Sequence, residues 1–255
     1  MHLYLKFLSL NLKIQMQYKC SFSLLVISQF INVIFMFLSI KFIFLRFSNT
    51  IFSYKEVLLC FAIVNFSYSL AKCVSEGLNT FSISLSNFEF DRLLVRPKNS
   101  LLQVIISKLD LHQIGSLAVS IIILLNSCYN FNWNSLKIFI LISMLISGLF
   151  VFMGLSIVSA AICFFSIKDI ELVNLLIYGG KEFGRFPLVI YGHFVLNFFT
   201  YIVPIALFQY YPLLFLIDKE TSIINIFCPL IGMLFPIPCI IFWNIGVKKY
   251  KSVGS

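Results

Sequence analysis

The sequence predicts an all-α integral membrane protein with six transmembrane helices, an N-terminal amphipathic elbow helix and a short amphipathic helix on the cytoplasmic side. Of its 255 residues, 60% are hydrophobic and 11% are charged, which is too little polar side chain to cover a water-soluble globule. The apolar residues form six blocks, each about the ~20 residues that a helix needs to cross a bilayer. The basic residues gather between alternate blocks. Because the blocks are continuously apolar rather than alternating, helices are favoured over a β-barrel.

The six expected spans cover residues 22–45, 57–75, 104–126, 136–165, 190–216 and 223–246. The first span has full length and no small-residue cleavage site follows it, so we expect it to stay in the mature protein. No linker long enough to separate two domains is present. We therefore expect residues 1–255 to form a single domain, with the elbow at 2–19, a cytoplasmic loop at 77–103 and spans three to six within 104–255.

The distribution of basic residues predicts the orientation. Thirteen of the nineteen Lys and Arg residues fall in the N-terminus, the second and fourth loops and the C-terminus, and five fall on the other side. In this count Lys181 and Arg185 belong to the fourth loop. The positive-inside rule then places both termini in the cytoplasm. The net charge of +9 is explained by this bias and does not point to nucleic acid.

Two amphipathic segments are expected outside the spans. In residues 2–19 one side carries polar residues at helical spacing, which predicts a helix on the membrane surface; a frayed cationic tail is the alternative. In the loop 77–103, charged residues alternate with apolar ones up to Pro97, which ends any helix there. This second helix either lies on the headgroups or docks on a soluble partner, and composition alone leaves both open.

Polar residues inside spans suggest further roles. Lys72 and Glu76 are four residues apart and are expected to form a local ion pair. Asp110 and His112 suggest a proton relay, but they lie near the cytoplasmic end of the span, where snorkelling or a partner such as Lys72 suffices to explain them.

Prolines interrupt the last two spans. Pro204 lies in span five, and Pro236 and Pro238 lie in span six. A proline removes a backbone hydrogen bond and kinks a helix, so we expect span five to bend or re-enter the membrane, and these three residues are candidate hinges. Simple packing is the alternative.

The sequence offers no enzymatic chemistry. It contains no Ser-His-Asp arrangement, no H-E-x-x-H motif and no glycine-rich phosphate loop, and its three histidines lie in three regions. We expect no metal site and no cofactor in this chain. The seven cysteines are scattered singly and are expected to be buried thiols, with a disulfide between Cys128 and Cys228 left open.

Three strings carry a family resemblance. Residues Phe90–Pro97 read FDRLLVRP, residues Phe186–Pro212 read FPLVIYGHFVLNFFTYIVPIALFQYYP, and the chain closes with VKKYKSVGS after Gly246. In this order they resemble the permease subunits of type-2 ABC exporters, in the branch with a D-R-x-L-x-R-P loop and a G-x-x-x-Y-x-S-x-G-S tail. The resemblance covers nearly the whole chain.

The resemblance implies a mechanism and partners. The second loop would be the coupling helix, which lies in a groove of a cytoplasmic ABC ATPase dimer through Phe90, Asp91, Arg92, Leu93, Leu94, Val95, Arg96 and Pro97. ATP and Mg would bind in that partner. A second permease, expected to be non-identical, would pair with this chain in the membrane lipid, and the substrate would pass along a central path between the two. Candidate path residues are the polar span positions Gln29, Asn32, Asn65, His193 and Asn197.

The implied function is outward movement of an amphipathic substrate such as a drug, antimicrobial peptide, lipid or glycan, by alternating access. The resemblance implies a bacterial cytoplasmic membrane, and the preference for Lys over Arg together with the richness in Ile, Phe and Asn points to an organism of low GC content. Two alternatives from other classes remain: a stand-alone ion- or proton-coupled carrier that uses Lys72, Glu76, Asp110 and His112, and a membrane immunity or structural protein that transports nothing.

Overall fold

The computed structural model describes residues 13–46, 52–129, 131, 133–165, 171–220 and 222–250. Over these ranges the chain is helical and no strand occurs. Five helices are long and apolar enough to cross a membrane, and the bent pair α10–α11 adds a sixth if it counts as one span. The predicted all-α membrane class is confirmed.

Six helices form the length of the bundle: α2 (Lys19–Arg46), α3 (Tyr54–Asn79), α7 (Ile114–Cys128), α8 (Ser135–Ile162), α12 (Ile223–Met233) and α13 (Pro236–Lys249). The further helices are α4 (Phe81–Ser86), α5 (Glu89–Leu94), α6 (Ser100–Ser107), α9 (Glu171–Phe183), α10 (His193–Tyr201) and α11 (Ile205–Leu216). Two short 3₁₀ turns, η1 (Leu111–Gln113) and η2 (Leu188–Tyr191), precede α7 and α10.

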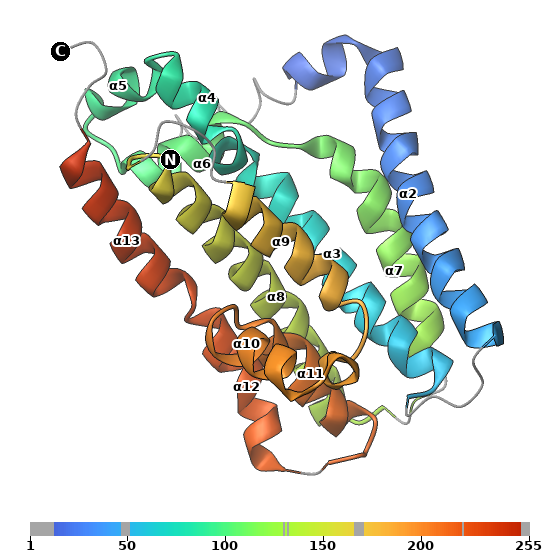
Figure 1. Ribbon diagram of the computed structural model, residues 1–255. Helices are drawn as coiled ribbons and strands as arrows, with labels where there is room; N and C mark the ends of the chain where they lie inside the picture. The colour runs from blue at the N-terminus through green and yellow to red at the C-terminus, as the bar shows by residue number, and fades with distance from the viewer. Residues whose placement is uncertain are drawn as a thin grey trace.

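The helices α3 and α8 form the centre of the bundle (Figure 1). On one side α7 packs on α3, and α2 packs on α7; on the other side α12 and α13 pack on α8. The helices α4, α5 and α6 gather at one end, next to the last turns of α13 (Figure 1). We call the segment 81–107 the hook.

The helix α3 is the most deeply buried long element because its sequence meets neighbours on every side. Its start is fixed by a capping box, in which the Ser53 hydroxyl accepts from the Glu56 amide and the Glu56 carboxylate accepts from the Ser53 amide. Near its other end, Gly77 allows α6 to approach so closely that a Cβ there would overlap the carbonyl oxygen of Val104. The hook is therefore attached directly to the central helix.

One predicted span starts later than expected. Span three does not start at residue 104, because α6 ends at Ser107 and the chain is extended at Lys108 before η1 begins, where the Asp110 side chain caps η1. Span five bends as expected: α10 and α11 meet at an angle of 114°, with the break at Pro204.

The predicted fourth loop contains a helix that packs on one face of the bundle. The helix α9 lies along α8 and α3 (Figure 1), and Lys181 in α9 and Arg185 just after it contact ring systems of α3. Without Lys181 and Arg185, eleven Lys and Arg residues remain on the predicted cytoplasmic side, against five on the other side. The direction of the charge bias is unchanged.

The predicted elbow is described only in part. Residues 13–17 are helical and the chain bends at Tyr18 before α2 begins. The remainder of the elbow, residues 2–12, lies outside the described ranges.

Candidate functional site

The hook is held to the bundle by an aromatic cluster. The Phe90 side chain on α5 is fully buried, with ring centroids 5.1 Å from Phe81 of α4, 5.3 Å from Phe164 and 5.5 Å from Tyr250. The indole of Trp243 on α13 closes the cluster, 5.0 Å from the Phe81 ring. Aromatic pairs at these distances stabilise packing beyond simple area burial. The cluster thus joins α5 to the end of α8 and to α13.

Burial separates the predicted coupling residues into two groups. Exposed side chains are Arg92, Leu94, Val95, Arg96 and Pro97, whereas Asp91 and Leu93 are half-buried. The Phe90 ring is enclosed by the chain's own aromatic residues, so in this structure it is turned into the chain and the exposed residues alone are open to a partner.

Polar contacts fix the same segment. The Tyr250 hydroxyl donates to the Asp91 carboxylate at 3.0 Å, and burial, together with this carboxylate, raises the pKa of Tyr250 to about 12. The side-chain amide of Gln103 donates to the backbone carbonyl oxygens of Leu93 and Lys98, each at 3.2 Å. The Asn99 side chain caps α6 by accepting from two of its first amides. The exposed tip of α5 therefore stands on a rigid base.

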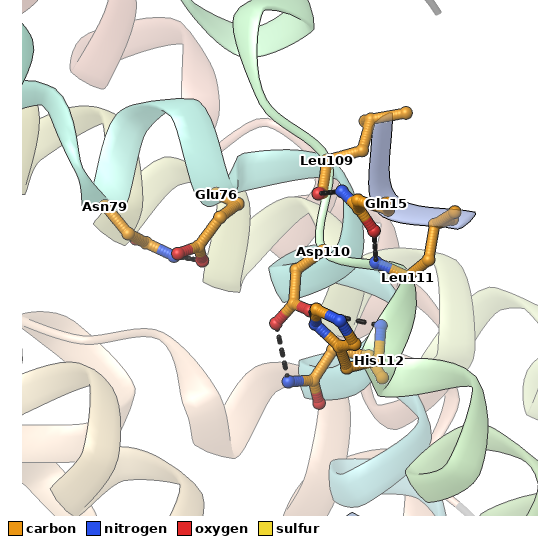
Figure 2. Close-up of polar contacts among 8 residues, drawn as sticks. Gln15, Glu76, Asn79, Leu109, Asp110, Leu111 and His112 are labelled. Atoms are coloured by element: carbon orange, nitrogen blue, oxygen red, sulfur yellow. Dashed lines mark hydrogen bonds and ion pairs between the residues drawn. The ribbon is translucent and has the colours of Figure 1, made fainter. Parts of the chain in front are cut away.

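A glutamine from the N-terminal helix clasps the break between α6 and α7. The Gln15 side chain donates to the carbonyl oxygen of Leu109 and accepts from the amide of Leu111 at 3.2 Å (Figure 2). The amide of Asp110, between them, donates to the carbonyl oxygen of Cys73 on α3 at 3.0 Å. The short extended segment is thereby paired on both sides.

Asp110 acts as a local cap in this structure. Its carboxylate accepts from the His112 amide at 3.1 Å and the Gln113 amide side chain at 2.9 Å, and it lies 2.8 Å from the His112 ring (Figure 2). These contacts satisfy the hydrogen-bonding capacity of the Asp110 carboxylate near the start of the span, so its position there does not require a role in proton transfer. The carboxylate is thus held by His112 and Gln113 and not by the expected partner Lys72.

Lys72 and Glu76 do not form the expected ion pair, and among the described residues Lys72 has no carboxylate within ion-pair distance. The Glu76 carboxylate accepts instead from the Asn79 side chain at 3.5 Å (Figure 2). Both residues line a cavity of about 190 Å³ between α3, α8 and α9. Polar side chains contribute much of its wall: Tyr68, Lys72, Ser75, Glu76 and Asn79 from α3, Thr80 at its C-cap, Ser156 from α8, and Asn174 and Tyr178 from α9.

The cavity as a whole was not predicted from the sequence. Its signal was present in α3, where Tyr68, Lys72, Ser75, Glu76 and Asn79 recur at three- and four-residue spacing and so share one helix face. The partner face on α9 could not be recognised, because that segment was assigned to a loop.

The candidate path residues are not brought together. Gln29 and Asn32 lie on α2 at one edge of the bundle, with Asn32 exposed, and His193 and Asn197 are exposed on α10. Asn65 is buried in α3, and neither polar atom of its side chain has a hydrogen-bond partner among the described residues. A common path through this one chain is not supported by their positions.

The candidate hinges stand at breaks in the helices. Pro204 precedes α11 at the 114° bend, and Pro236 is the first residue of α13, where the chain leaves α12. Pro238 lies in the first turn of α13. Movement at these positions stays a prediction.

The possible metal ligands and the thiols of the described residues are scattered. There, no group of three His, Cys, Asp or Glu side chains could hold a metal ion. The seven cysteines, Cys128 and Cys228 included, are free thiols.

Comparison with known proteins identifies the family. The sequence profile of a family described as ABC-2 family transporter protein matches residues 14–254. The comparisons with curated proteins and with solved structures give no match. Membrane proteins of this family work with ABC ATPases, and a bundle of apolar helices is what such a permease requires. This chain belongs to the ABC-2 transporter family and is a multi-pass membrane protein with a permease role in an ABC transporter.

Proposed function

We propose that this chain is the permease subunit of an ATP-driven exporter in a bacterial cytoplasmic membrane, with both termini in the cytoplasm and the whole chain forming one permease domain. It moves an amphipathic substrate outward by alternating access, together with a second, non-identical permease. The chain performs no catalysis. ATP and Mg are bound by the partner ATPase dimer, which supplies the energy of transport.

The observation that carries this proposal is the contrast between the tip and the base of the hook. Val95 is 86% exposed, and Arg92, Leu94 and Arg96 are exposed around it. Apolar and basic side chains on one short element suit a protein groove with acidic edges, since the apolar part gains from burial and the charges select the partner. The base is fixed by the aromatic cluster, so a displacement of the tip moves the attached transmembrane helices instead of bending the hook.

Two contacts connect this lever to the spans. The helix α6 packs against α3 at Gly77, and the cluster joins α5 to α8 and α13. Closure of the ATPase would therefore tilt α3, α8 and α13 together, while the broken helices at Pro204 and Pro236 accommodate the change. Repacking of two permeases against each other would then open the path outward.

Co-purification from native membranes tests the coupling. We expect the double variant R92E/R96E to lose at least about tenfold of the ATPase activity that accompanies the tagged chain, because charge reversal opposes docking at the tip. The matched control is K248E/K249E, which reverses two exposed lysines of α13 at the same end of the bundle and is expected to retain the ATPase. If the ATPase stays bound and active in R92E/R96E, the hook is not the coupling element.

Transport by the isolated chain tests the energy source. Vesicles that contain this chain without any ATPase are expected to show no uphill transport. Transport that persists there and collapses with the proton gradient would instead identify a stand-alone carrier.

A further inference from the structure

The helix α9 borders two hollows of opposite chemistry. It contributes Asn174 and Tyr178 to the polar cavity of about 190 Å³ that it shares with α3 and α8. With α10 it forms a groove of about 280 Å³ whose wall is apolar and includes Leu176, Gly180, Phe183, Phe194 and Phe198. The lining residues of the two hollows are neighbours along α9, so one ligand with a polar and an apolar part can reach both.

The polar cavity offers charges of both signs. Its described lining residues supply one ammonium group, from Lys72, and one carboxylate, from Glu76. No ion pair among the described residues includes either group. Just outside the lining, Asp110 and Lys108 act on Glu76 with opposite signs, and the charge of Lys181 acts on Lys72. A ligand of a single sign would therefore approach a like charge in the lining as well as an opposite one.

A zwitterionic headgroup complements both lining charges at once. Charged side chains between membrane helices are costly unless they are paired. A phosphate group can accept from Lys72 and a primary ammonium can donate to Glu76, each in a charge-assisted hydrogen bond. The cavity volume of about 190 Å³ is well above the ~15 Å³ that a single water requires. A headgroup of several heavy atoms can therefore enter.

The surface of α9 between the two hollows is open. An added Cβ at Gly179 would meet nothing within 4 Å, and the flanking Leu175 and Tyr178 side chains are exposed. The helix runs from the hook end of the bundle toward α10 (Figure 1). Along it, Asn174 and Phe183 are separated by about 14 Å, close to the ~15 Å of hydrocarbon in one leaflet. A lipid with its headgroup at the hook end thus has the length to extend an acyl chain into the apolar groove.

We propose that α9 carries a binding site for a zwitterionic phospholipid with a primary ammonium, in the leaflet on the hook side. The headgroup lies in the polar cavity, with its phosphate at Lys72 and its ammonium at Glu76. One acyl chain crosses the open surface at Gly179 and fills the groove between α9 and α10. The site is distinct from the coupling tip and does not depend on an ATPase.

Lipid binding to the full-length protein in detergent tests the headgroup. The probes are dioleoylphosphatidylethanolamine, dioleoylphosphatidylglycerol, which lacks the ammonium, and dioleoylglycerol, which lacks the whole headgroup; bound lipid is counted by native mass spectrometry. We expect one saturable phosphatidylethanolamine site, with phosphatidylglycerol about tenfold weaker, the loss of one charge-assisted contact. Dioleoylglycerol is expected to bind more weakly than either.

A change of selectivity separates recognition from damage to the fold. E76Q should weaken phosphatidylethanolamine about tenfold and leave phosphatidylglycerol within about twofold, so the preference between them disappears, which general unfolding cannot produce. K72Q should weaken both phospholipids, because both carry the phosphate. The control K248Q removes an exposed lysine of α13 and should change neither.

The crossing at Gly179 is tested by side-chain size. G179L places a branched side chain on the open surface and is expected to weaken both phospholipids several-fold, whereas the matched control G179A leaves room for the chain and is expected to bind like the wild type. Equal binding of the three lipids, a wild-type preference retained in E76Q, unchanged binding in K72Q, or equal binding by G179L and G179A would each overturn the proposed site.

Discussion

At the scale of single residues, small side chains determine how closely the central helices approach. The hydroxyls of Ser69 and Ser116 lie 2.6 Å apart between α3 and α7, and Ser156 donates to Ser75 at 3.3 Å between α8 and α3. Small residues with hydroxyls allow close packing where lipid offers no hydrophobic driving force. The serines of this bundle therefore act as packing residues.

The glycine at the α3–α6 crossing is expected to be required. G77A should cost about 1–3 kcal/mol, because the added methyl group meets the Val104 backbone, which cannot move aside easily. Its control is G179A on α9, where an added Cβ meets nothing within 4 Å and helix propensity improves by up to ~1 kcal/mol. Thermal unfolding in detergent should rank G179A at or above the wild type and G77A below it. Equal unfolding temperatures would contradict the close approach.

Tyr250 should make stability depend on alkaline pH. Its pKa rises from 10.0 to about 12 because the phenol is partly buried beside Asp91, so the folded state holds the proton more tightly than the unfolded state. The resulting stabilisation is complete below pH 10 and is lost as the pH rises toward 12. The difference in unfolding temperature between the wild type and Y250F should therefore shrink from pH 9.5 to 12. A constant difference would show that this proton does not contribute.

At the scale of elements, the hook should depend on its buried ring more than on its surface. F90A leaves a cavity in the aromatic cluster and should cost about 3 kcal/mol or more, whereas I83A removes a side chain that is 55% exposed on α4 and should cost less than ~1 kcal/mol. Hydrogen exchange of the α5 amides is expected to rise in F90A alone. Matching exchange in both variants would mean that the cluster does not hold the hook.

Hydropathy predicted the long apolar helices, but it did not predict a helix whose charged residues are accommodated by contacts with distant parts of the chain. The helices α2, α3 and α8 closely follow the expected spans, because their sequences are continuously apolar. The helix α9 was missed because its segment carries Lys181, Glu182 and Arg185, whose charges are offset by a mutual pair and by ring contacts from α3. These partners are distant in sequence.

The candidate site was predicted to a similar extent. The string FDRLLVRP located the hook, since charges interleaved with apolar residues before a proline are a local signal. The burial of Phe90 was not predictable, because Phe164, Trp243 and Tyr250 reach it only in the folded chain. Only one side of the polar cavity could be predicted, from the polar face of α3; the facing helix α9 could not.

At the scale of the whole molecule, the two ends of the bundle differ. The hook lies at one end, whereas the other end is joined by surface ion pairs, Lys137 with Asp218 at 2.6 Å and Lys219 with Glu56 at 2.8 Å. The larger number of basic residues near the hook predicts that it faces the cytoplasm.

Cysteine labelling in intact cells checks this orientation. A membrane-impermeant maleimide should label E220C from outside and K98C only after permeabilisation, with the parent chain measuring the background from exposed Cys20. Labelling of K98C in intact cells would reverse the assignment and remove the hook from the ATPase side.

The buried Arg185 has a consequence for biosynthesis. Its guanidinium is paired with Glu182, contacts the Met36 sulfur of α2 at 3.0 Å and lies 5.9 Å from the Phe61 ring centroid of α3. A nascent segment with these charges cannot partition into lipid alone at an acceptable cost. We therefore expect this segment to pack only after the first two crossings have been inserted and offer it a surface, so that assembly follows the order of translation.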